Sequence, residues 1–237
     1  MGFWGGVAAI GSAICGAVSS ICGGIGGALM TGISAFASSL VGIIAATPGI
    51  NVIAMVILVC QTICKVAELL AEKPEEEKPE ELAVMAEEAE LKPENFDSVS
   101  AYIAYLREQI KVNKEQIDQK IEAMDKKDIA YYQAIGSSLY SKQIDEKYNV
   151  ELTPEFWKTV TDKKMSEKVV SEYVANMSAN GIKNGDSLAN FVEGRDMDIN
   201  ERSSVFNTMK EAIRKENPGL SEKELNVKVS ELKSRTE

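Results

Sequence analysis

The sequence predicts an all-α protein with an N-terminal membrane region and a C-terminal water-soluble region. The first 64 residues carry no charged side chain, and the next 31 are strongly acidic and interrupted by prolines. The remainder shows the helical spacing of apolar residues, without the alternation typical of strands. We therefore expect a membrane domain over residues 1–71, an acidic linker over 72–95 and a soluble all-helical domain over 96–237.

The uncharged region is long enough for two or three membrane-spanning helices. A bilayer core needs about 20 apolar residues as a helix, and Met1–Cys64 is about three times as long. The stretch Thr47-Pro48-Gly49-Ile50-Asn51 predicts a turn, and Asn51 can cap the next helix. Val52–Leu70 is the expected second arm of a hairpin. The first arm, Phe3–Ala46, either bends or extends beyond the bilayer, and two spans are favoured over three.

Small residues recur every fourth position in the first arm and predict a close helix–helix contact. Twelve of the 17 glycines precede Asn51, although glycine in a helix costs about 1 kcal/mol relative to alanine. Rows of small residues let helix backbones approach closely in lipid. The alternatives are a tight hairpin within one chain, a glycine-zipper oligomer or pore, and a signal-like segment. The residues predicted to form the contact are Ser12, Gly16, Ser20, Gly24, Ala28 and Gly32.

The acidic segment predicts a solvated spacer between the two regions. Lys65–Asn95 contains eleven Glu and four Lys, and Pro74 and Pro79 prevent a continuous helix. Repulsion between like charges extends such a segment. We expect it to hold the soluble domain away from the bilayer, with a short helix over Glu80–Leu91. The alternative is an acidic strip that docks a basic partner.

A long helix with a heptad pattern is predicted over Asp97–Met124. Apolar residues repeat at alternating intervals of four and three, with the polar Asn113 at one of these positions. A single Asn in such a seam sets register and oligomeric state in coiled coils. The seam can serve self-association or pack against other helices of the same domain. It comprises Val99, Ile103, Leu106, Ile110, Asn113, Ile117 and Met124.

Capping signals predict the remaining helices. Ser, Thr or Asp precedes the apolar periodic stretches, as at Thr153, Ser166 and Asp198, and Gly or Pro follows several of their ends. The expected helices cover residues 129–148, 155–163, 167–180, 186–192 and 201–216, followed by one that carries Leu225, Val229 and Leu232.

The sequence contains no residue set typical of an active site. There is no His, all four cysteines lie in the uncharged region, and no phosphate-binding glycine loop is present. Asp196-x-Asp198-x-Asn200 matches the first ligands of a calcium loop, but Glu201 and Asn207 stand where Gly and Glu are required. We therefore expect a protein that is not an enzyme and has no cofactor and no metal site.

The net charge and the order of the regions limit the kinds of partner that we expect. A net charge of −10 argues against nucleic acid, and the apolar stretch has no basic segment before it, so we expect the soluble region in a cytosol. The layout is similar to that of membrane components of bacterial secretion or transfer machines and of bacterial proteins delivered into host membranes. It shows no motif specific to a named family.

These observations predict a non-enzymatic integral membrane protein. It would bind membrane lipid, self-associate through its small-residue helices as a homo-oligomer or with membrane-complex partners, and dock other proteins through its acidic helical domain. The alternative is a pore-forming or secreted protein that inserts into a target or host membrane.

Replacing Gly24 with leucine tests the small-residue row. The added isobutyl group would block the close approach and remove several contacts of about 1 kcal/mol each, while membrane insertion stays intact because Leu favours lipid. Ile25→Leu, on the bulky side of the helix, is the control. Crosslinking through Cys22, in a chain without its other cysteines, measures association between copies. Equal crosslinking and function in both variants would mean that the row is a feature of composition and forms no close contact.

Overall fold

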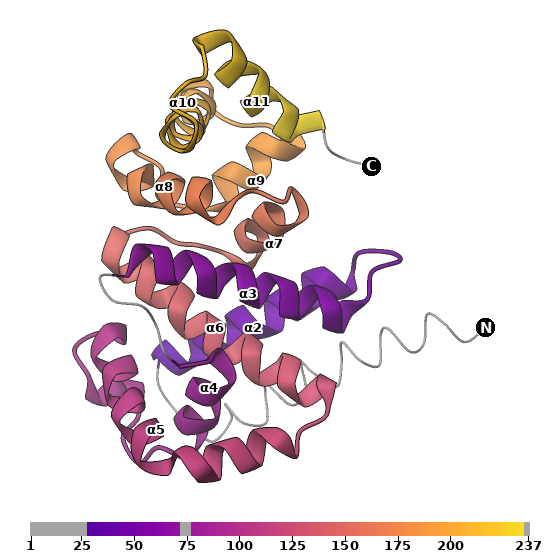
Figure 1. The fold of residues 1–237 in the computed structure, drawn as a ribbon. Coiled ribbons are helices and arrows are strands. Elements are labelled where there is room, and N and C mark those ends of the chain that lie inside the picture. Colours follow the sequence, from indigo (N-terminus) through magenta and orange to yellow (C-terminus); the bar gives the residue numbers. More distant parts are fainter. Residues whose placement is uncertain (1–27, 72–76, 235–237) are drawn as a thin grey trace. The chain divides into compact units, whose positions relative to one another are not determined.

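The computed structural model describes residues 28–71 and 77–234, which form ten α-helices, two short 3₁₀ helices and no β-strand (Figure 1). The all-α prediction is confirmed for these residues. In chain order the elements are α2 (Ala28–Ala45), α3 (Val52–Leu70), α4 (Pro79–Glu88), η1 (Pro93–Asn95), α5 (Val99–Glu122), α6 (Lys126–Tyr148), α7 (Pro154–Asp162), α8 (Glu167–Met177), η2 (Ser178–Asn180), α9 (Asp186–Glu193), α10 (Ile199–Glu216) and α11 (Glu222–Ser234).

Contacts within the chain define two compact units. Unit 1 comprises Met1–Cys64 and Glu75–Gln143, and unit 2 comprises Lys65–Pro74 and Ile144–Glu237. Each unit is therefore built from two separate pieces of sequence, and α3 and α6 each contribute residues to both units. The predicted membrane domain, linker and soluble domain divide the chain at other places, and that division stays a prediction.

In unit 1, helix α4 packs against α5. The apolar residues of α4 between Leu82 and Ala86 are all buried. The predicted short helix over 80–91 is present, but it ends at Glu88. Of the heptad seam on α5, five apolar residues are buried within this single chain, namely Val99, Ile103, Leu106, Ile110 and Ile117. This burial favours the alternative in which the seam packs inside its own domain.

Asn113 interrupts the long helix that the heptad pattern predicts. Its backbone lies outside the helical region, at φ −108° and ψ 17°, so that α5 bends there. The Asn113 side-chain amide donates a hydrogen bond to the carbonyl of Gln109 at 2.8 Å. Such back-bonding to the carbonyl four residues earlier competes with the regular ladder and bends helices.

Helix α6 carries small residues where other parts of unit 1 approach it closely. A Cβ atom on Gly136 would lie 1.8 Å from the carbonyl oxygen of Pro79. The hydroxyl of Ser137 lies 3.8 Å from the sulfur of Cys64, and Tyr140 donates a hydrogen bond to the carbonyl of Glu77 at 3.0 Å. The first residue of α4 therefore reaches α6 only because position 136 has no side chain.

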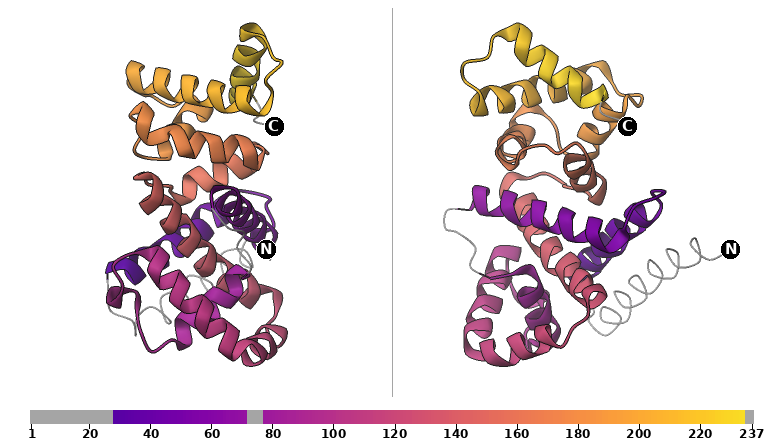
Figure 2. Two further views of the ribbon diagram at one scale, coloured as in Figure 1. Left: turned by 60° about the vertical axis from the view of Figure 1, so that its left-hand side comes forward. Right: turned by 45° about the vertical axis from the view of Figure 1, so that its right-hand side comes forward.

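Unit 2 is a bundle in which α8 packs along α10, and α10 also contacts α9 and α11 (Figure 2). Phe156 of α7 stacks on Tyr173 of α8, with ring centroids 6.4 Å apart, and both side chains are fully buried. Three helix starts match the predicted caps. Thr153, Ser166 and Asp198 each accept a hydrogen bond from the backbone of the following turn.

A short clip joins the segment before α7 to the segment before α9. The backbone amide of Glu151 donates a hydrogen bond to the carbonyl of Lys183 at 2.8 Å, and the backbone amide of Gly185 donates one to the carbonyl of Glu151 at 2.7 Å. These bonds make an isolated parallel bridge between Glu151 and Asn184. A Cβ atom on Gly185 would lie 2.8 Å from that of Phe156, so the clip depends on this glycine.

Gly136→Ala should destabilise unit 1, because the new methyl group meets a backbone carbonyl that no rotamer change can move. Overpacking of this kind costs about 1–3 kcal/mol. Gly42→Ala is the matched control, because Gly42 also lies in a helix but nothing lies within 4 Å of its added Cβ. There the substitution should stabilise the helix by up to about 1 kcal/mol. Chemical denaturation followed by circular dichroism compares them, and equal midpoints would contradict the constraint.

Candidate functional site

Two apolar helices, α2 and α3, follow each other over residues 28–70. Residues 46–51 join the two helices, and Gly49 takes the left-handed conformation at φ 77°. The Thr47 hydroxyl donates to the carbonyl of Ile43 at 3.2 Å. Asn51 accepts a hydrogen bond from the amide of Ala54 at 3.2 Å, which is the predicted helix cap.

Within the described residues, α3 is the one helix long and apolar enough to cross a membrane. It spans Val52–Leu70 with a mean hydropathy of 2.0, and 44% of its most apolar window is buried inside the protein. Helix α2 contributes the shorter apolar stretch Thr31–Ala45. This assignment rests on length and composition, and a buried core helix of a soluble protein meets the same two criteria.

Helix α3 has a buried face and an exposed face. Its exposed face carries Ala54, Leu58 and Gln61 before the first charged residue, Lys65. Leu58 is 48% exposed. The side chains of the buried face are apolar or a thiol, and in the unit 1 part of the helix they are Val52, Val56, Val59, Cys60 and Ile63. The helix therefore presents uncharged residues on both faces as far as Cys64.

The last turns of α3 belong to unit 2 and are held there by polar contacts. Lys65 pairs with Glu167 at the start of α8 at 3.2 Å. Lys147 donates a hydrogen bond to the carbonyl of Leu70 at 2.8 Å, where the helix end leaves carbonyls without partners. A hydrogen bond to its own backbone amide, together with Lys65, lowers the pKa of Glu167.

The acidic segment does not stay in solvent over α4, contrary to the expected spacer. Glu81 is 4% exposed and Glu80 is 8% exposed. Gln133 of α6 donates a hydrogen bond to Glu80 at 3.2 Å. Ion pairs join this segment to α5, among them Glu77–Arg107 at 2.9 Å, Glu81–Lys114 at 2.9 Å and Glu87–Lys120 at 2.8 Å. The burial of Glu80 and Glu81 is compensated because each meets a donor on a neighbouring helix.

Lys120 forms ion pairs with two acids of α4. Besides Glu87, it pairs with Glu88 at 3.0 Å, and Tyr132 donates a hydrogen bond to Glu87 at 2.8 Å. Partial burial lowers the pKa of Lys120, but the hydrogen bonds to Glu87 and Glu88 outweigh it and raise the value to about 12. Burial, and then the Glu87 carboxylate, raise the pKa of Tyr132 to about 12.

The predicted small-residue row falls mostly outside the described residues. Ser12, Gly16, Ser20 and Gly24 precede the described part of the chain, and Ala28 is the first residue of α2. Gly32 is half-buried, with nothing within 4 Å of an added Cβ. The row therefore stays a prediction. The two remaining seam residues, Asn113 and Met124, are half-buried.

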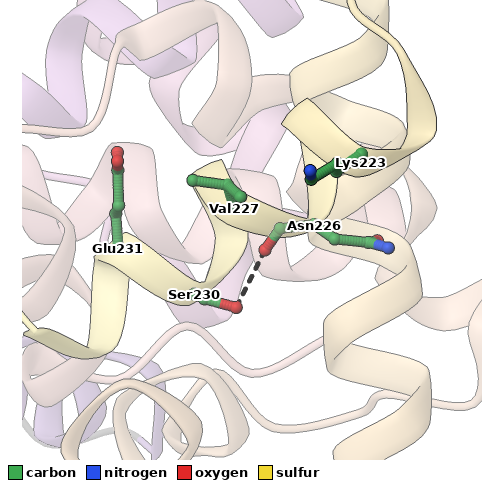
Figure 3. Close-up of a pocket in the computed structure, with 5 residues that line it drawn as sticks. All are labelled: Lys223, Asn226, Val227, Ser230 and Glu231. Carbon is green, nitrogen blue, oxygen red and sulfur yellow. Dashed lines mark hydrogen bonds between the residues drawn. The ribbon is translucent and has the colours of Figure 1, made fainter.

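Unit 2 carries three adjoining hollows that share residues. The first is lined by Leu69 and Lys168, the second by Val169 and Ile213, and the third by Val227 and Ser230. Glu216 lines both the first and the second hollow, and Glu231 lines both the second and the third. The second hollow has a volume of about 130 Å³ and an apolar floor that includes Val169, Ile213 and Leu232. Figure 3 shows the third, where Val227 and Glu231 point from α11. The Ser230 hydroxyl there donates to the carbonyl of Asn226 at 2.8 Å.

Sequence reasoning missed the close approach to α6 and the ion pairs between α4 and α5. A signal for the first is the run of small residues Gly136-Ser137-Ser138. A signal for the second is the spacing of Arg107 and Lys114, which are seven residues apart and therefore lie on one face of a helix. The calcium-like stretch proves to be a helix start, because Asp198 caps α10. No group of three metal-binding side chains lies in the described ranges.

Lys120→Gln should lower the free energy of unfolding by about 0.5–1 kcal/mol, because it removes two ion pairs between helices. Lys111→Gln is the control, since Lys111 pairs with Glu108 on its own helix, and it should change stability by less than about 0.5 kcal/mol. The pKa of Lys120 is higher in the folded protein than in the unfolded chain, where it is near 10.4, so Lys120 contributes its full stabilisation below that pH. The difference in free energy of unfolding between the unmodified protein and Lys120→Gln should therefore shrink as the pH rises from there through 12. Denaturation curves at neutral and alkaline pH measure both effects, and a pH-independent gap would contradict the assignment.

Comparison with known proteins adds no functional assignment. No family model matches the chain, and neither a curated protein nor a solved structure matches it.

Proposed function

We propose that this chain is a non-enzymatic integral membrane protein whose uncharged N-terminal region enters a bilayer while unit 2 stays in water and docks other proteins. The observation that carries the proposal is the α2–α3 segment. Two apolar helices are joined by a tight turn, and no charged side chain occurs between Ala28 and Cys64.

The contacts of the turn suit an apolar surrounding. A polar group without a hydrogen-bond partner costs several kcal/mol in hydrocarbon. The side chains of Thr47 and Asn51 bond to the backbone of their own helices, and the amide of Ala46 donates to Gly42 at 3.0 Å. These groups therefore need fewer partners from water when the turn approaches the far surface of a bilayer.

The docking role of unit 2 is supported by the adjoining hollows across α8, α10 and α11. They combine apolar floor residues such as Ile213 with carboxylates at the shared positions Glu216 and Glu231. Protein interfaces commonly have this arrangement of apolar centre and polar rim. Self-association through the small-residue row, and a place in a bacterial secretion or transfer machine, are hypotheses that rest on the sequence pattern alone.

The second candidate is a pore-forming or secreted protein that is soluble before it inserts. The burial of one face of α3 favours it, because a protein that shelters Val56, Val59 and Ile63 from water has a form compatible with solution. The same segment would then exchange protein contacts for lipid at a target membrane. The two candidates share the inserted state and differ in how it is reached.

Leu58→Lys should abolish stable membrane association. A lysine in the middle of a membrane helix costs about 3 kcal/mol, which is about a hundredfold in partition. Leu91→Lys is the matched control, because Leu91 is 46% exposed and Leu58 is 48% exposed, but Leu91 lies outside the proposed membrane segment. The measurement is the fraction that stays with membranes after alkaline extraction.

Equal extraction of Leu58→Lys, Leu91→Lys and the unmodified chain would sink the membrane proposal. Release of trapped dye by purified protein added to liposomes, lost in Leu58→Lys, would select the second candidate. Retention only after insertion during synthesis would select the first.

A further inference from the structure

Helix α3 changes its surroundings at the same residue at which the chain acquires its first charge. The boundary between the two compact units falls between Cys64 and Lys65, and Lys65 is the first charged residue of the sequence. The six residues from Lys65 to Leu70 continue the same helix but belong to unit 2. There they bury Val66 and Ala67. One continuous helix therefore has two parts with different partners.

The uncharged part of α3 is too short to cross a bilayer. Val52–Cys64 has 13 residues, which is about 20 Å of helix at 1.5 Å per residue, whereas the hydrocarbon core is about 30 Å thick. The whole helix has 19 residues, or about 28 Å. The missing length is therefore about the length of the six residues that unit 2 holds.

The contacts that hold these six residues are of a kind that breaks easily. The side chains of Lys65 and Glu167 are 61% and 38% exposed, and an exposed ion pair contributes about 0–1 kcal/mol. The Lys147 hydrogen bond to the Leu70 carbonyl is also exposed. Val66 and Ala67 lose little when lipid replaces protein around them, and a lysine near a helix end can extend its ammonium group to the interface. The other charged residue, Glu68, lies two residues before the end of the helix, so it reaches only the interface.

We infer that Lys65–Leu70 is an exchangeable segment, packed in unit 2 in the described form and withdrawn into the membrane helix when α3 spans the bilayer. The inference rests on the proposed membrane function and adds its consequence for unit 2. Leu69 lines one of the adjoining hollows together with Lys168, Glu172 and Glu216. Withdrawal removes this wall of the hollow, so membrane insertion and the docking surface of unit 2 are coupled.

A zero-length carbodiimide crosslink tests the exchange, because it joins an amine to a carboxylate only at contact. Lys65 and Glu167 lie 3.2 Å apart, and Lys210 and Glu222, which join α10 to α11 within unit 2 and do not line this hollow, also lie 3.2 Å apart as the control. Purified full-length protein is crosslinked in detergent-free buffer and after incorporation into phosphatidylcholine liposomes, and both crosslinked peptides are quantified by mass spectrometry. The Lys65–Glu167 yield should fall at least fivefold in liposomes, while the Lys210–Glu222 yield stays constant.

A longer apolar helix should reverse the effect. Seven apolar residues inserted after Cys64 add two turns and about 10 Å, so the span is complete without Lys65–Leu70. In this variant the Lys65–Glu167 crosslink should persist in liposomes. An unchanged crosslink yield in unmodified protein that resists alkaline extraction overturns the exchange but leaves the membrane function standing. Complete alkaline extraction of the protein, both when it is added to liposomes and when it is inserted during synthesis, overturns the membrane function and the exchange with it.

Discussion

The burial of two carboxylates on α4 is the constraint from which the arrangement of unit 1 follows. A carboxylate loses hydration when it is buried, and only a charged or hydrogen-bonding partner compensates for that loss. Glu81 finds Lys114 on α5, and Glu80 finds Gln133 on α6. Because these two acids are adjacent in sequence, their partners fix α4 against both helices at once. The pairs at Glu77 and Glu87 extend the contact with α5 in both directions.

Local features of the fold were predictable from the sequence, because they depend on residues only a few positions apart. Thr153, Ser166 and Asp198 were recognised as helix caps, and Asn51 was recognised at the turn. Each makes a hydrogen bond to an amide two or three residues later, so the pattern is complete within a short window of sequence.

Features that depend on distant residues were not predictable in this way. Composition assigned the acidic segment to solvent, because a run of glutamates gives no sign of bases that lie about 30 residues further on. The heptad pattern on α5 gave no indication that α4 packs against this helix within the chain. At Asn113 the pattern suggested a register-setting residue, whereas the side chain bonds to its own helix.

The discontinuous composition of the two units has a consequence for how the chain is made. The hydrogen bond from Lys147 to the Leu70 carbonyl joins residues 77 positions apart. At roughly 5–20 residues per second on the ribosome, Lys147 follows Leu70 by about 4–15 s. During that interval the end of α3 is complete but its place in unit 2 does not yet exist. A nascent chain therefore offers this helix to a membrane or a chaperone before its own fold can compete for it.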